Sequence, residues 1–289
     1  MKIVIIGANG QLGQEFFKLP SSQQMIPLTH AEVEVEDPDS VQKRLEEHRP
    51  EVVVNLASFN KVDEAEDRPE AAFRVNALGA LNVAKAAARV EAAVVFISTD
   101  YVFGAEPGRD RPYLESDPPG PLSVYGVSKL TGEHLVRLAN PRHYIIRTCG
   151  LYGAVTSRKG WTFPELMLQK ARAGEKLRVV ADQVLTPTYA YDLVRAMIAV
   201  IEKGRPGLYH LTSAGACSWF EFARTTLELA GARAEIEPVS SASYKARAIR
   251  PSYSVLASER LAPLGLPAPR PWPEALRAYL TEKGVIQKK

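Results

Sequence analysis

Two side chains four residues apart, Tyr125 and Lys129, have the types and spacing that acid–base chemistry requires. They stand downstream of residues 98–104, which are typical of the end of a buried strand. On a helix, this spacing places both side chains on one face. An ammonium beside a phenol favours the phenolate, so the phenol becomes a usable proton donor or acceptor well below its ordinary pKa of about 10. Redox chemistry at a carbonyl needs such a group, although the pair alone is more often an ordinary Tyr and Lys on a half-exposed helix.

The residues at the amino terminus favour a functional role for Tyr125 and Lys129, because they predict a dinucleotide site. Residues 1–6 form an apolar, β-branched run, and glycines follow at once as Gly7, Gly10 and Gly13. In a strand–turn–helix unit, the first glycine permits a tight turn, the second lets the backbone approach a pyrophosphate, and the third lets the helix pack on its strand. The free N–H groups of the helix N-terminus complete an anion site. The glycines are spaced more widely than in the common dehydrogenase fingerprint, which indicates a particular branch of dinucleotide enzymes.

Short apolar runs alternate with helical patterns along the chain, as in a parallel sheet covered by helices on both faces. The predicted strands are residues 1–6, 24–28, 33–35, 52–57, 93–98 and 144–147. The predicted helices are residues 38–47, 69–89, 164–173, 191–202 and 219–230, and a further helix carries Tyr125. The expected fold class is α/β, a Rossmann-type doubly wound parallel sheet with a smaller, interleaved C-terminal substrate lobe.

This alternation also suggests how the chain is divided. Residues 1–150 are expected to form the dinucleotide-binding domain, with returning segments near 175–206 and 240–256, and residues 151–289 to form most of the substrate-binding lobe. Ligands of open parallel sheets bind at the carboxyl ends of the strands. Four polar residues fall at such ends: Asn55, Ser98, Thr99 and Arg147.

Composition excludes several classes of function. The 36 basic and 33 acidic residues leave a net charge of only +3, and the basic residues are scattered, so nucleic-acid binding is not indicated. Cys149 and Cys217 form neither a disulfide framework nor a metal motif and are expected to be small buried residues. No apolar stretch approaches about 18 residues and the chain begins directly in a core strand, so we expect no membrane contact and a cytoplasmic location.

Together these residues resemble the extended short-chain dehydrogenase/reductase family, and within it the dTDP-4-dehydrorhamnose reductases. The matching motifs are the glycine turn, residues 98–104, and residues 125–129 followed by Gly132 and Glu133. Residues 62–66, 182–188, 207–212, 218–222 and 250–256 resemble that subfamily in the same order, so the match runs nearly end to end. The blocks after Gly150 are its more specific part.

The resemblance implies NADPH- or NADH-dependent reduction of the C4 ketone of dTDP-4-dehydro-L-rhamnose to dTDP-L-rhamnose, with a nucleotide sugar as the partner. Tyr125 would then deliver a proton to the carbonyl oxygen and Thr99 would hydrogen-bond it. Lys129 would bind the nicotinamide ribose and hold the pKa of Tyr125 down. Several relatives pair through helices, so a homodimer is an expected assembly, although no residue identifies an interface.

The resemblance also implies contacts with the ligands. Cofactor contacts are implied for Gly7, Asn9, Gly10, Gln11, Leu12, Glu34, Ala57, Asn76 and Lys129. Substrate contacts are implied for Asp100 and for Arg250, whose guanidinium would grip the diphosphate. The acidic residue that usually selects the ribose hydroxyl is not evident, since Thr29 and His30 follow the second strand. Glu15 matches a magnesium ligand of some relatives, but a lone carboxylate on a first helix is expected to be exposed, and we predict no metal site.

Two departures concern the sugar end of the site. Residues 58–61 stand where the subfamily has an alanine–tyrosine–threonine run, and Gly150 stands where it has a tryptophan. The identity of the hexose is therefore less certain than the type of reaction. Three alternatives remain: another nucleotide-sugar reductase, a 4-epimerase, and a binding protein like the regulatory β subunit of methionine adenosyltransferase. A 4,6-dehydratase is disfavoured because Tyr101, and not a glutamate, follows Asp100.

Overall fold

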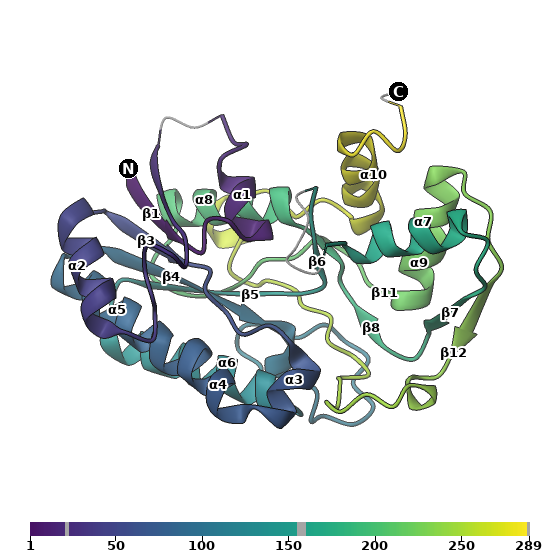
Figure 1. The fold of residues 1–289 in the computed structure, drawn as a ribbon, viewed down its shortest axis with the longest axis horizontal. Coiled ribbons are helices and arrows are strands. Elements are labelled where there is room, and N and C mark those ends of the chain that lie inside the picture. Colours follow the sequence, from purple (N-terminus) through teal and green to yellow (C-terminus); the bar gives the residue numbers. More distant parts are fainter. Residues whose placement is uncertain (21–22, 155–159, 288–289) are drawn as a thin grey trace.

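A six-stranded, fully parallel sheet forms the centre of the protein (Figure 1). The computed structural model describes residues 1–20, 23–154 and 160–287. The strand order is β10-β5-β4-β3-β1-β2, which reverses between β1 and β3 as in a doubly wound sheet. The strands are β1 (Lys2–Ile6), β2 (Gln24–Leu28), β3 (Val52–Asn55), β4 (Ala93–Thr99), β5 (His143–Thr148) and β10 (Gly207–His210). The expected fold class is therefore confirmed.

Both faces of the sheet are apolar because helices cover both. In β1, Ile3 and Ile5 pack into one core, while Val4 and Ile6 pack into the other. Helices α1 (Gln11–Phe16) and α8 (Ala190–Lys203) cover the first face, and α2 (Pro38–His48), α5 (Ala80–Arg89) and α6 (Val124–Ala139) lie on the opposite side, below the sheet in Figure 1. Burial on both faces explains why these strands are continuous hydrophobic runs and do not alternate.

Most predicted elements occur close to their predicted bounds, with three differences. Residues 33–35 form no strand, although Val33 and Val35 are buried in the core. The predicted helix 69–89 is present as α4 (Pro69–Phe73), η1 (Arg74–Gly79) and α5, and η1 is a π-helical turn. Such turns insert an extra residue and often occur at functional sites. A further short helix, α3 (Val62–Asp67), precedes α4 in a segment for which no helix was predicted.

A smaller lobe lies at one end of the sheet, at the right in Figure 1. Its helices are α7 (Phe163–Arg172), α9 (Trp219–Ala230) and α10 (Trp272–Glu282). Its short strands pair as β6 (Leu151–Tyr152) with β9 (Thr188–Tyr189), β8 (Val184–Leu185) with β11 (Cys217–Ser218), and β7 (Leu177–Val180) with β12 (Ile236–Val239). The remaining elements are 3₁₀ turns: η2 (Asp100–Val102), η3 (Ser241–Ser243) and η4 (Ala262–Leu264).

The chain crosses between the two parts more than once. After β6 and α7 it returns to the sheet as α8 and β10, and it leaves again as β11 and α9. The division at residue 150 remains a prediction. In the parts of the chain that the structure describes, no helix combines the length and apolar character needed to cross a membrane.

Candidate active site

The candidate site lies along the carboxyl edge of the sheet. Because β1, β3, β4 and β5 are parallel neighbours, their carboxyl ends meet at one edge. The glycine turn follows β1, Asn55 ends β3, Thr99 ends β4 and Thr148 ends β5. Thr99 and Thr148 are paired residues in the register of the two strands. Segments far apart in sequence thus converge where ligands of such sheets bind.

The glycine turn has the shape that a phosphate site needs. Gly7 has φ +81°, and its N–H donates to Leu28 O at 2.8 Å, which fixes the turn between β1 and β2. At Gly13, a Cβ atom would lie 2.6 Å from Ala8 O, so only glycine lets α1 pack this closely on the turn. Gly10 is the N-cap of α1 and provides no side-chain cap for the first N–H groups of the helix.

An unpaired amide on the same turn points to a ligand. The Nε2 atom of Gln11 is buried and has no hydrogen-bond partner among the described residues. Buried donors without a partner are rare in proteins, and ligands commonly supply the missing partner. Together with the uncapped N-terminus of α1, this donor fits a dinucleotide pyrophosphate.

Thr99 and Tyr125 lie together beside the end of β4. Enclosure of the phenol raises the pKa of Tyr125 to about 12, and a hydrogen bond with the Thr99 hydroxyl partly opposes that rise. Ser123 begins α6 by capping Gly126 N at 3.2 Å, which sets the position of Tyr125 in the first turn. The ring of Tyr101 packs edge-on against that of Tyr125, with centroids 6.0 Å apart. The structure therefore holds Tyr125 as a protonated phenol.

Lys129 is buried one helical turn further along α6. Its Nζ atom lies 4.1 Å from the centroid of the Phe96 ring. Burial lowers the pKa of Lys129 to about 7, while the negative charge of Glu133 partly opposes that fall. The prediction that Lys129 lowers the pKa of Tyr125 is wrong for the ligand-free chain, because loss of hydration dominates both groups.

Asn76 holds the site together from within the protein. Its Oδ1 atom accepts from Phe59 N at 2.9 Å and from Ser58 Oγ at 3.2 Å. Its Nδ2 atom donates to Phe59 O at 3.1 Å and to Ser128 Oγ at 3.0 Å. All four hydrogen-bonding positions of the amide are thus used within the protein. The side chain of Asn76 therefore supports residues 58–59 and α6, and does not make the implied contact with the cofactor in this arrangement.

Beneath Lys129 lies a buried ion pair that the sequence did not reveal. Glu133 receives Arg147 Nε at 2.8 Å and Arg147 Nη2 at 2.7 Å, and the side chains of both are at most 3% exposed. Ser98 donates to the same carboxylate. Ser98 and Arg147 therefore bind a buried carboxylate inside the protein, although their positions at strand ends suggested ligand contacts.

The two implied substrate residues are already engaged within the protein. The carboxyl group of Asp100 is hydrogen-bonded with Thr99, Cys149 and Ser254, and its implied contact with the sugar stays a prediction. Arg250 binds Asp63 through Nη1 at 3.1 Å and Nη2 at 2.6 Å. The hydrogen bond from Arg250 lowers the pKa of Asp63 to about 2. Arg250 can grip a diphosphate with both Nη atoms only by leaving this carboxylate.

Three further predicted positions differ in their surroundings. Glu34 is half-exposed and lies 3.3 Å from His30 Nδ1. Ala57 N donates to Asn55 Oδ1 at 3.1 Å, which shapes the turn after β3. Glu15 is fully buried, contrary to the expected exposed carboxylate, and Lys18 bridges it to Glu282 at 3.0 and 2.8 Å. Within residues 1–20, 23–154 and 160–287, no group of three or more acidic, histidine or cysteine side chains could hold a metal ion.

Comparison with known proteins identifies the family. Residues 1–285 match the family model described as the RmlD substrate binding domain. The chain belongs to the RmlD substrate-binding domain family. A dTDP-4-dehydrorhamnose reductase of Mycolicibacterium smegmatis is 41% identical over 280 residues, which cover 96% of this chain and 84% of that protein. The spore coat polysaccharide biosynthesis protein SpsK of Bacillus subtilis is 39% identical over 284 residues, 98% of each chain.

A solved RmlD-family structure shows the same fold. It is the dTDP-4-dehydrorhamnose reductase of Bacillus anthracis in complex with NADP, and it is 36% identical to this chain with a TM-score of 0.92. The match covers 97% of this chain and 99% of that one. The predicted resemblance to extended short-chain reductases is therefore confirmed.

One departure within the RmlD family has a structural reason. Gly150 has φ +51°, and a Cβ atom there would lie 2.8 Å from Leu185 Cδ1. No other side chain fits without displacing Leu185. Trp219 packs against the cluster that contains Cys149 and Leu185, next to this position.

Sequence reasoning missed one further hydroxyl in this RmlD-family site. Thr148 Oγ1 is buried at the end of β5 and has no hydrogen-bond partner among the residues described. Its position beside Thr99 in the sheet register gave a signal, because both threonines end neighbouring strands.

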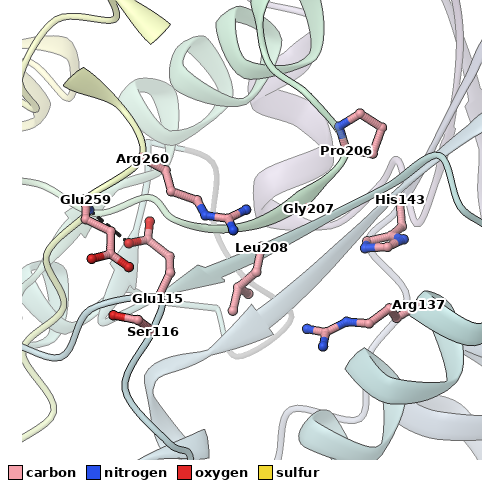
Figure 2. Close-up of a pocket in the computed structure, with 9 residues that line it drawn as sticks. All are labelled: Glu115, Ser116, Arg137, His143, Pro206, Gly207, Leu208, Glu259 and Arg260. Carbon is pink, nitrogen blue, oxygen red and sulfur yellow. Dashed lines mark hydrogen bonds between the residues drawn. The ribbon is translucent and has the colours of Figure 1, made fainter. Parts of the chain in front are cut away.

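A separate hollow of about 360 Å³ lies at the opposite edge of the sheet (Figure 2). Its lining includes His143 and Gly207, the first residues of β5 and β10, so it lies at the amino ends of these strands. In Figure 2, Arg137 and Arg260 point into it from opposite sides of Leu208. This hollow is distinct from the site that carries the RmlD-family motifs.

Proposed function

We propose that the protein reduces the C4 ketone of dTDP-4-dehydro-L-rhamnose to the hydroxyl of dTDP-L-rhamnose, with NADPH or NADH as the reductant. The observation that supports this most directly is the buried phenol of Tyr125 beside the Thr99 hydroxyl at the carboxyl edge of the sheet. Ketone reduction requires a proton donor at the oxygen that gains charge. The names of the related reductases supply the sugar and the nucleotide.

The glycine turn would hold the pyrophosphate of the cofactor through backbone N–H groups and the unpaired amide of Gln11. Its residues are Gly7, Asn9, Gly10, Gln11 and Leu12. The reduced nicotinamide, when bound, supplies the hydride. The unpaired hydroxyl of Thr148 would donate to a polar group of the bound ligands.

In this proposal Tyr125 transfers its phenolic proton to the ketone oxygen as the carbonyl becomes an alkoxide. A pKa of about 12 keeps the phenol protonated at neutral pH, which suits a proton donor. Thr99 donates a hydrogen bond to the developing negative charge, and such donors act strongly in a site from which water is excluded. Lys129 would bind the nicotinamide ribose.

Arg250 would bind the substrate diphosphate by exchanging the carboxylate of Asp63 for phosphate oxygens. This exchange keeps the guanidinium paired with an anion in both states, and the half-exposed carboxylate of Asp63 is then left to water. The predictions of a cytoplasmic location and of a homodimer rest on the sequence and the resemblance alone.

The decisive test is turnover of dTDP-4-dehydro-L-rhamnose, measured as oxidation of NADPH and, separately, of NADH. Tyr125→Phe should lower kcat by about 10²–10⁴-fold and leave cofactor binding intact, because only the proton donor is removed. Undiminished turnover in this variant would remove Tyr125 as the acid. Retained oxidised cofactor with interconversion of sugars, and no net reduction, would instead support an epimerase.

A further inference from the structure

The carboxyl group of Asp100 is enclosed by neutral hydrogen-bond donors. Its Oδ2 atom receives Ser254 Oγ at 2.6 Å and Cys149 Sγ at 3.0 Å, and its Oδ1 atom lies 3.1 Å from Thr99 Oγ1. Asp100 is only 4% exposed. Nowhere in residues 1–20, 23–154 or 160–287 does it form an ion pair. A buried carboxylate without a cationic partner is unfavourable, and such a group commonly keeps its proton.

Thr99 has one hydrogen and two lone pairs, and this limits what it can do. One lone pair accepts the N–H of Tyr101 at 3.1 Å. If Asp100 is ionised, the Thr99 hydrogen must point to Oδ1, so Thr99 can only accept on its remaining side. If Asp100 is protonated on Oδ1, it donates to Thr99, both lone pairs are filled, and the Thr99 hydrogen must point outward. Only the second arrangement lets Thr99 donate to a ketone oxygen or to Tyr125.

We propose that Asp100 is a positioning residue that stays protonated on Oδ1 and turns the Thr99 hydroxyl outward as a donor. This role rests on the proposed reduction and deepens it, because a reductase needs donors at the oxygen that becomes negative. The proton of Asp100 stays on Oδ1 throughout, so no bond to it breaks. Every polar atom of the group is satisfied in this arrangement, since Oδ2 accepts two donors and Oδ1–H donates.

The surroundings favour the neutral acid. Burial raises the pKa of Asp100, and the hydrogen bonds with Cys149, Ser254, Thr99 and its own backbone N–H only partly oppose that rise. The titratable groups that face it are the Cys149 thiol after β5, and the phenols of Tyr101 and Tyr125, from η2 and α6. All three groups are held neutral by burial, which raises the pKa of each. The nearby guanidinium of Arg250 is already paired with Asp63.

An asparagine at position 100 copies the protonated acid. Its NH₂ group can donate to Thr99 where Oδ1–H did, and its carbonyl can accept from Ser254 and Cys149. Asp100→Asn should therefore keep kcat within about tenfold of the wild-type value, and it should keep that value as the pH rises. A loss of more than about tenfold, in a variant that still binds NADP and melts like the wild type, would show that the carboxylate is required and would overturn the proposal. Asp110→Asn makes the same change at an exposed position and should leave kcat and its pH dependence unchanged.

A second measurement needs no substrate. Infrared spectroscopy at neutral pH should show the carbonyl band of a protonated carboxylic acid that is absent from Asp100→Asn. Ser254→Ala should shift this band, because the carbonyl of Asp100 then loses one donor, and this variant decides the matter if Asp100→Asn does not fold. Absence of the band from the wild-type protein would overturn the proposal. If the wild type shows the band but turns over no keto sugar, the proposed function fails and the state of Asp100 stands.

Discussion

The buried pair of Glu133 and Arg147 offers a quantitative test of how the interior beneath the site is stabilised. Arg147→Met keeps most of the apolar volume of the side chain and removes its charge. Glu133 then remains buried at about 2% side-chain exposure, with Ser98 as its remaining donor among the described residues. Removal of one partner from a buried pair costs about 3–5 kcal/mol, because the other charge is left uncompensated. At about 2 °C per kcal/mol for a chain of this length, the melting temperature should fall by about 6–10 °C.

Equilibrium unfolding in urea, followed by circular dichroism, measures this loss. The matched control is Arg68→Met, which breaks the exposed pair of Arg68 and Glu64 at a similar distance of 2.8 Å. That change should cost less than about 1 kcal/mol, because water already solvates both groups. Comparison of the two variants separates the effect of burial on the free energy of unfolding from the effect of the ion pair itself.

The double variant Arg147→Met, Glu133→Gln tests the cause. It should recover about half of the lost stability, because the unpaired charge is replaced by a neutral amide that costs only about 1–3 kcal/mol. If the double variant is no more stable than Arg147→Met alone, the loss comes from packing. The guanidinium also lies 5.0 Å from the centroid of the Phe103 ring, so packing is a real alternative.

Two more predictions concern helix α6. Because burial lowers the pKa of Lys129 from 10.5 to about 7, the unfolded chain binds more protons than the folded chain between these values. The stability of the ligand-free protein should therefore rise with pH across this window, by up to about 1.4 kcal/mol per pH unit, and Lys129→Met should remove the rise in urea titrations at several pH values. Gly132→Ala would place a Cβ atom 2.3 Å from Asn76 O and 2.7 Å from Phe96 Cζ. It should cost at least about 1–3 kcal/mol through overpacking, and an unchanged melting temperature would show that α6 can move away from η1.

The fold was largely predictable because its signals are local. The apolar runs of β1, β3, β4 and β5 are buried on both faces, so each strand could be recognised without its neighbours. The strand predicted at residues 33–35 was wrong because the burial of Val33 and Val35 comes from tertiary packing and not from a local pattern. Alternation over three residues carries no information on strand pairing. Residues 62–67 were missed as a helix because four of the six are acidic, which leaves no apolar stripe.

The electrostatic state of the site could not be predicted from spacing. The separation of Tyr125 and Lys129 correctly indicated one helix face, but the sign of each pKa shift depends on burial, which the sequence does not give. In water, an ammonium lowers the pKa of a nearby phenol. In this interior, loss of hydration raises the pKa of Tyr125 and lowers that of Lys129, so both groups move toward their neutral forms.

The case of Asp100 shows why hydrogen-bond direction lies beyond a sequence pattern. Its partners Cys149 and Ser254 are 49 and 154 residues away, and they meet only after β4, β5 and the segment before residue 256 are assembled. Once assembled, the group admits two proton arrangements with the same heavy-atom positions, and only one of them leaves Thr99 a donor. The chemistry at the ketone then depends on a proton that no residue spacing reports, and a single change from a carboxyl group to an amide is enough to test it.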